Sequence, residues 1–399
     1  MLGIEGKAYI INSDVCDTRK MAEDAFEGYA QIILNADVLL TNERSRAILA
    51  RYPVVMNSDV TFDTEEELAV STQNGKFTLH PGQVPQTPTL LVVNGCMTIE
   101  PGCDLHAYRK IVVNGIVICP QSLTGSLGDV SVNGVVESYP DDCTVLDSIF
   151  VPDRVFVLRA KENARYYVRK KVILTAKELD VSALAQKGVQ FVTPELVCTE
   201  SDTEAAVSLV DEQAKLTVVP DGCTYVDKDV TLDRRLLKKY GKSLYIDGDL
   251  TLDEESAPFL ESLSYVYVTG TVTLPASLAE AFDEVDGVFD EIEVLSGSVV
   301  QNKVTVRLTP SMLASSSDGL TIRNCAHVQV DESITPEELE QANLTIENCA
   351  QISCTPKQRG AIELASKNVA SISDEATSIA DMLKGMLGNK VVNADHCVL

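Results

Sequence analysis

The stretch YVYVTGTVTL, residues 265–274, consists of β-branched, aromatic and Leu residues interrupted only by Thr269-Gly270. Such residues favour strands, and a strand-like run split by a turn dipeptide is typical of a hairpin. The same pattern recurs, however, as LLVVNGCMTI at 90–99, LYIDGDLTL at 244–252 and LTIRNCAHVQV at 320–330. The recurrence predicts that each copy pairs with the equivalent copy in the next repeat instead of folding back on itself.

The copies align on two apolar residues, at alternate positions, followed by an Asn- or Asp-containing turn. Neighbouring copies are 19 to 24 residues apart, and a period of this length is typical of a solenoid. One such unit cannot bury its apolar face alone, so the units are expected to stack. The aligned copies begin at Ile32, Val54, Leu91, Ile111, Val130, Leu244, Val266, Leu320 and Leu344.

Helix-start signals follow many of these strands. Thr335-Pro336-x-Glu338 and Thr355-Pro356-x-Gln358 match a capping box with Pro at the first helical position. Each unit is therefore predicted to contain a strand, a corner, a short strand and a short helix. In residues 100–129, turn-like segments take the place of the helix. Further cap signals lie at Thr64, Thr175, Thr193, Ser277 and Thr309.

The copy NLTIENCAQIS, residues 343–353, resembles a leucine-rich repeat through Leu344, Ile346, Cys349 and Ile352. GLTIRNCAHVQV and LLVVNGCMTI are similar to it. The resemblance implies an α/β solenoid with stacked coils of short parallel strands and short helices or turns on the outer side. The copies with turns in place of helices are closer to a parallel β-helix. The sequence therefore leaves two alternatives for the solenoid, leucine-rich-repeat-like or parallel β-helix, and does not determine whether it is curved or straight.

The chain is predicted to have capped ends. A helical cap with an apolar face is expected in residues 1–30, and an amphipathic helix followed by a closing strand in 373–399. The final VVNADHCVL echoes IILNADVLL, so this strand either closes the chain's own array or pairs with another chain. Between the caps, residues 31–140 form a first array, 141–240 a less regular continuation and 241–372 a second array.

Composition limits the class of protein. The net charge is −26, which disfavours nucleic acid and anionic membranes as partners. No signal peptide and no apolar run long enough to span a membrane is recognised, so a cytoplasmic location is expected. The eleven Cys form no CxxC pair and are interpreted as reduced thiols.

Candidate chemistry in the sequence is sparse. Asp227, Asp229, Asp247 and Asp249 are candidates for stacking at one corner, where carboxylates attract Ca²⁺. A solvated acidic corner is the preferred interpretation, because no known calcium-binding motif is present. None of the four His has a second His at metal-binding spacing. No catalytic or cofactor-binding motif is recognised, so no catalytic residue, cofactor or metal is predicted.

We therefore expect a non-enzymatic scaffold that self-associates, as a homo-oligomer or filament, or binds a protein partner. Basic residues between 154 and 171 and the segment RRLLKK at 234–239 are interpreted as charged surface or as contacts to acidic faces of other chains. The alternatives are a leucine-rich-repeat-like module for a protein partner and a carbohydrate-active β-helix enzyme.

Overall fold

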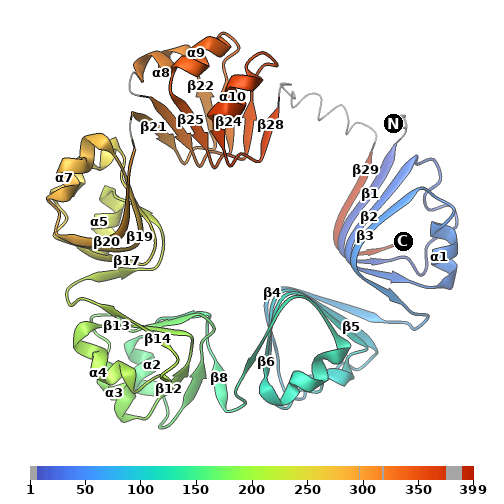
Figure 1. Ribbon diagram of the computed structural model, residues 1–399. Helices are drawn as coiled ribbons and strands as arrows, with labels where there is room; N and C mark the ends of the chain where they lie inside the picture. The colour runs from blue at the N-terminus through green and yellow to red at the C-terminus, as the bar shows by residue number, and fades with distance from the viewer. Residues whose placement is uncertain (1–6, 296, 317–318, 374–388) are drawn as a thin grey trace.

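The computed structural model describes residues 7–295, 297–316, 319–373 and 389–399. The chain forms several sheets of stacked parallel strands, an arrangement compatible with the predicted repeat fold. We group these sheets into five blocks. Figure 1 shows that the blocks surround an open centre and that most of the labelled helices lie on the outer side.

Block 1 is one sheet with the strand order β29-β1-β2-β3. Three of its strands follow one another along the chain, whereas the fourth comes from the opposite end. A short helix begins after Asn42, whose side chain accepts a hydrogen bond from the amide of Ser45. The elements are β1 (Ala8–Asp17), β2 (Gln31–Thr41), α1 (Glu43–Leu49), β3 (Val54–Asp63) and β29 (Lys390–Val398).

Block 2 is one sheet of four consecutive strands, ordered β4-β5-β6-β7. Short 3₁₀ turns stand where other blocks have α-helices, as the sequence predicted for this region. The elements are β4 (Ala69–Leu79), β5 (Thr89–Ile99), η1 (Leu105–Ala107), β6 (Lys110–Pro120), η2 (Gln121–Asp129) and β7 (Val130–Tyr139).

Block 3 has two sheets of parallel strands, because the corner of each repeat divides what is one long strand in block 2 into two short strands. Their orders are β12-β10-β8 and β14-β13-β11-β9. The elements are β8 (Cys143–Val145), β9 (Ile149–Phe150), α2 (Arg154–Arg159), β10 (Arg165–Tyr167), β11 (Lys171–Ile173), α3 (Val181–Gln186), β12 (Gln190–Val192), β13 (Glu195–Thr199), η3 (Glu200–Asp202), α4 (Thr203–Val207) and β14 (Lys215–Val219).

Block 4 contains the stretch with which the sequence analysis began. Its sheet has the order β15-β17-β19-β18-β16, and β20 pairs with the far side of β19. The elements are β15 (Thr224–Val226), β16 (Val230–Thr231), α5 (Arg234–Tyr240), β17 (Ser243–Ile246), β18 (Leu250–Thr251), η4 (Glu254–Ser256), α6 (Ala257–Leu260), β19 (Tyr265–Pro275), η5 (Ala276–Leu278), α7 (Ala279–Asp283) and β20 (Gly287–Leu295).

Block 5 repeats the two-sheet arrangement, with orders β21-β23-β25-β27 and β22-β24-β26-β28. The elements are β21 (Ser298–Gln301), β22 (Thr305–Leu308), α8 (Pro310–Ser315), β23 (Leu320–Arg323), β24 (His327–Val330), α9 (Pro336–Gln341), β25 (Leu344–Glu347), β26 (Gln351–Ser353), α10 (Arg359–Ala365), β27 (Ser366–Lys367) and β28 (Ser371–Ser373).

The predicted register is confirmed. Strand β19 runs through Thr269-Gly270 and pairs in parallel with β17, with Val266 opposite Leu244, so the stretch is not a hairpin. The alignments of Ile111 with Leu91 and of Leu344 with Leu320 are also register pairs. Within β19 the apolar residues of the pattern are buried against the helices of the block, and each fully buried Val or Leu stabilises the fold by roughly 1.5–3 kcal/mol.

The predicted helical cap in residues 1–30 is wrong. Residues 8–17 form strand β1, and residues 19–28 form a series of turns. The apolar residues expected on the helix, Met21 and Phe26, are nevertheless fully buried. The physical reason is that β1 has a strand on each side, so this end of the chain is an interior position of a sheet and needs no helical cover.

The final strand closes the chain on itself. Strand β29 pairs in parallel with β1 over eight residue pairs, including Asn393 with Asn12. Its pairing partner is thus the first strand of the same chain. The amphipathic helix predicted between β28 and β29 falls within residues 374–388, which lie outside the described residues.

The helix-start predictions have mixed outcomes. The capping box of Thr335 and Glu338 is present at α9, and Thr309 caps α8. The signals at Thr64 and Thr193 are not followed by α-helices, because the chain enters strands β4 and β13 within a few residues. Strand pairing with the neighbouring unit overrides the local helix signal there.

Candidate functional site at the chain closure

A three-residue motif, Asn followed by a small residue and Asp, marks the corner of every strand in block 1. Because neighbouring strands pair in register at this motif, the equivalent side chains of the four strands form rows. The motifs are 393–395 in β29, 12–14 in β1, 35–37 in β2 and 57–59 in β3.

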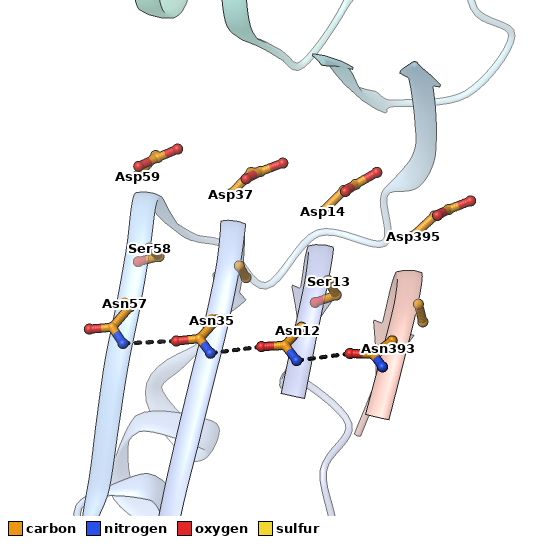
Figure 2. A pocket seen from close by; sticks show the side chains of 12 residues that line it. Asn12, Ser13, Asp14, Asn35, Asp37, Asn57, Ser58, Asp59, Asn393 and Asp395 are labelled. Carbon is orange, nitrogen blue, oxygen red and sulfur yellow. Dashed lines mark hydrogen bonds between the residues drawn. The ribbon is translucent and has the colours of Figure 1, made fainter. Parts of the chain in front are cut away.

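The asparagines form a continuous ladder of side-chain hydrogen bonds. Each Nδ2 donates to the Oδ1 of the next residue, from Asn57 to Asn35 at 2.8 Å, from Asn35 to Asn12 at 2.7 Å and from Asn12 to Asn393 at 2.8 Å. Figure 2 shows this ladder crossing all four strands. The last bond joins residues from the two ends of the chain, so the ladder helps to hold β29 in place.

The aspartates form a second row, which we call the acidic row: Asp395, Asp14, Asp37 and Asp59. Figure 2 shows their carboxylates projecting beyond the same side of the corner. The acidic row and the Asn ladder line an open groove of about 840 Å³. Parallel strands stand about 4.8 Å apart, so like charges are close neighbours here.

The surroundings of Asp37 connect block 1 with block 2. Burial and the charges of Asp14 and Asp59 raise the pKa of the Asp37 carboxyl, while hydrogen bonds from Asn94 and Asn114 oppose that rise. The acidic row therefore faces the asparagine corner of block 2. Apolar residues of the two blocks, including Val38 and Val92, pack together beside this contact.

Two polar atoms of the groove lack partners. Oγ of Ser13 and Oδ2 of Asp14 are buried and have no hydrogen-bond partner among the described residues. Within the described part of the chain, no group of three or more His, Cys, Asp and Glu side chains is arranged to hold a metal ion. The groove is thus a negatively charged surface with unsatisfied acceptors.

The sequence's calcium candidates do not form a single cluster. Asp227 and Asp247 instead bind the ammonium of Lys171, at 2.8 and 2.7 Å. The hydroxyl of Tyr225 donates to Asp247 at 2.5 Å, and these contacts lower the pKa of Asp247 against the opposing effect of burial. A lysine from block 3 thus forms ion pairs with two carboxylates of block 4.

The other two candidates serve the backbone at the corner of block 4. Oδ1 of Asp229 accepts a hydrogen bond from the amide of Asp249 at 2.9 Å, and Oδ1 of Asp249 accepts one from the amide of Thr271 at 2.9 Å. Each of these side chains thus links the corner of its own repeat to the corner of the following repeat. This arrangement gives both carboxylates a structural role.

Two basic residues of the 154–171 cluster, besides Lys171, pair within the chain. Arg165 contacts Asp142 at 2.7 Å, and Arg169 contacts Glu137 of β7 at 2.8 Å. The second contact joins block 3 to block 2. Arg323 plays a similar part between blocks 5 and 4, because it lies 2.9 Å from Glu293 of β20. The junctions between blocks are therefore held partly by charge.

A second cleft of about 850 Å³ lies between blocks 2 and 3. Its lining includes the apolar side chains of Ile116, Ile118 and Phe150. Polar contacts stand at the same cleft, with His80 Nδ1 2.9 Å from Glu100 and an ion pair of 2.5 Å between Lys76 and Asp147. The cleft offers apolar surface beside these polar contacts, which suits an extended or partly apolar molecule.

Sequence reasoning missed two features of these sites. The motif at 12–14 was overlooked because it lies inside the predicted helical cap, although the repetition of Asn-Ser-Asp and Asn-Ala-Asp was the available signal. The contacts of Lys171 with Asp227 and Asp247 could not be predicted from the sequence, because the partners lie more than 50 residues away from Lys171.

Comparisons with protein-family models, curated proteins and solved structures gave no match. No helix in the described residues has the length and apolar character needed to cross a membrane.

Proposed function

We propose that the chain is a non-enzymatic scaffold, an α/β solenoid closed into a ring, which associates with further copies of itself along open strand edges. The observation that carries this proposal is the location of the exposed apolar side chains. Many of them lie on strands that end a sheet, namely on β3, β7, β20 and β29: Val55, Met56, Val135, Val136, Val288, Ile292, Val294, Val391 and Val398.

Open edges of this kind favour association. An edge strand presents unpaired backbone groups, and apolar side chains beside them add surface that water disfavours. The outer edge of β1 is covered by β29, so the candidate edges are those of the terminal strands β29, β3, β7 and β20. Since Arg165, Arg169 and Lys171 already have partners within the chain, we do not expect these three residues to bind acidic faces of other chains. Each chain carries a net charge of −26, so salt that screens the repulsion between copies should favour association.

Light scattering over a range of concentrations tests this proposal. The double variant V135K/V136K places charge on the β7 edge and should shift the wild-type assemblies towards single chains. Leu364 is 84% exposed but lies on helix α10, so L364K is the matched control and should leave assembly unchanged. A wild-type protein that stays a single chain at every concentration would contradict the proposal.

A recognition module for a protein partner is the second candidate, and the cleft between blocks 2 and 3 favours it. This alternative predicts a single-chain protein whose partner binding is lost when the cleft is filled. Ile116→Trp fills it, and Val304→Trp, at an 80% exposed position outside the cleft, is the control. Equal binding by both variants would argue against this candidate.

A further inference from the structure

Two cysteines from opposite ends of the chain stand side by side. Cys16 of β1 and Cys397 of β29 are register partners in the parallel pairing that closes the chain. Both are free thiols, and both are buried in the same apolar cluster, with exposed fractions of 0% and 8%. Register partners on adjacent strands point to the same face of the sheet.

We propose that Cys16 and Cys397 form a redox-sensitive clasp, in which a disulfide between them locks the last strand onto the first. Neighbouring parallel strands are about 4.8 Å apart, within the range of Cα separations that disulfides span. The β-carbons need to approach one another by roughly 1 Å, which an edge strand such as β29 can accommodate by a small shift. A bond formed under that constraint is readily reduced again, as a reversible clasp requires.

The closed strand protects both thiols from reaction. Burial, with smaller contributions from Cys397 and Asp17, raises the pKa of the Cys16 thiol to about 12. Burial also raises the pKa of Cys397. Because thiolates are the reactive species, oxidation begins when the edge strand β29 opens and exposes Cys397.

The oxidant belongs to the class of low-molecular-weight disulfides, such as oxidised glutathione. The thiolate of Cys397 attacks one sulfur of this disulfide, forming a mixed disulfide and releasing one thiol. Before β29 fully pairs with β1 again, the thiolate of Cys16 attacks the Cys397 sulfur and releases the second thiol. Cys16 and Cys397 are together oxidised by two electrons, and the added disulfide is reduced to two thiols that take up the two protons.

A second pair of thiols provides an internal control. Cys325 and Cys349 follow the paired strands β23 and β25, are each 2% exposed, and lie close enough for the two thiols to influence one another. A bond between them would join adjacent units of block 5 and would not affect the chain closure. The two pairs therefore share similar burial and differ in what they connect.

The experiment treats the full-length chain with oxidised glutathione and identifies linked peptides by mass spectrometry. The expected product is a single chain lighter by two hydrogen atoms, containing the Cys16–Cys397 peptide. Amide exchange in β1 should slow by about tenfold or more in this product, because the locked strand no longer opens. The linked peptide should disappear in C397S and persist in C325S.

Hydrogen exchange of β1 in reduced C397S establishes that this variant retains the closed fold. The clasp is overturned if Cys397 stops at the mixed disulfide, or if only dimers linked through Cys397 appear. It is also overturned if β1 is protected but no Cys16–Cys397 bond forms. The inference depends on chain closure and not on association between copies, so a protein that remains a single chain in light scattering would leave it intact.

Discussion

Blocks 1 and 2 both turn their strands at an asparagine, yet they continue differently after it. In block 2 a glycine follows, and Gly115 has φ +139, where an added Cβ would lie 2.0 Å from the carbonyl oxygen of Gly95. In block 1, Ser or Ala follows the asparagine, and an aspartate comes next. The comparison shows that the corner itself does not require the acidic row, because block 2 forms the same corner without it.

The two blocks also differ in how they are completed. Block 2 consists of four consecutive strands, whereas block 1 takes its fourth strand from the far end of the chain. Tyr9 and Ile11 of β1 are buried partly through this remote strand, and the ammonium of Lys390 lies 4.3 Å from the ring centre of Tyr9. The sheet of block 1 is therefore completed only by chain closure, whereas the sheet of block 2 is completed by one continuous segment.

The largest difference between the two kinds of corner should appear when an alanine occupies the position after the asparagine. G115A is expected to destabilise block 2 by about 3–5 kcal/mol, because it combines an unfavourable φ with a steric clash against Gly95. Ser58 occupies the equivalent position in block 1, and S58A should change the stability by no more than about 0.5 kcal/mol. Amide exchange in β5 and β2, measured at increasing urea concentrations, reports the stability of each block. Equal losses of stability in G115A and S58A would show that the two kinds of corner do not differ in this respect.

A smaller effect is expected from the Asn ladder. Asn35 donates one ladder bond and accepts another, so N35A should destabilise block 1 by about 1–2 kcal/mol. Asn133, exposed at the edge of block 2, is the control, and N133A should have an effect within about 0.5 kcal/mol. Equal effects in the same exchange measurement would mean that the ladder does not stabilise block 1.

The smallest effect should come from the acidic row. The pKa of Asp37 is raised in the folded state, so its charged form is disfavoured by folding. The native state then holds its proton to a higher pH than the unfolded chain, and this group makes stability fall as pH rises through the folded pKa. D37N should therefore stabilise block 1 at pH 7 by less than about 1 kcal/mol.

The pH dependence provides the check on that sign. The advantage of D37N should disappear below the ordinary pKa of 3.8, where Asp37 is protonated in both states. Thermal unfolding of D37N and wild type across this pH range measures the difference. A destabilising effect of D37N at pH 7 would show that the bonds from Asn94 and Asn114 outweigh the repulsion from Asp14 and Asp59.

The sequence predicted local repetition well and long-range contacts poorly. The registers of Ile111 with Leu91 and of Val266 with Leu244 were readable, because alternating apolar residues and a corner recur at each turn of the chain. The final strand also resembles β2 in sequence. This resemblance fits pairing with a strand of the same chain and pairing with another chain equally well. Only the three-dimensional path shows that β29 reaches β1 of its own chain.

The candidate sites were less predictable for the same reason. The position of Asp227 near a corner was predicted, but its ion pair with Lys171 depends on how blocks 3 and 4 pack. The N-terminal helix was predicted from the spacing of Met21 and Phe26. The same spacing is compatible with a compact series of turns, which the structure shows in residues 19–28. Because β1 pairs with β29 on one side and β2 on the other, no helix is needed to cover its edge.

Amide exchange in β1 tests the chain closure most directly. In a chain that ends at Asn389, the amides of β1 that face β29 should exchange at least about tenfold faster, while those of β5 and β6 remain unchanged. Unaltered exchange in β1 after removal of residues 390–399 would contradict the account, because the first and last strands would then not be paired.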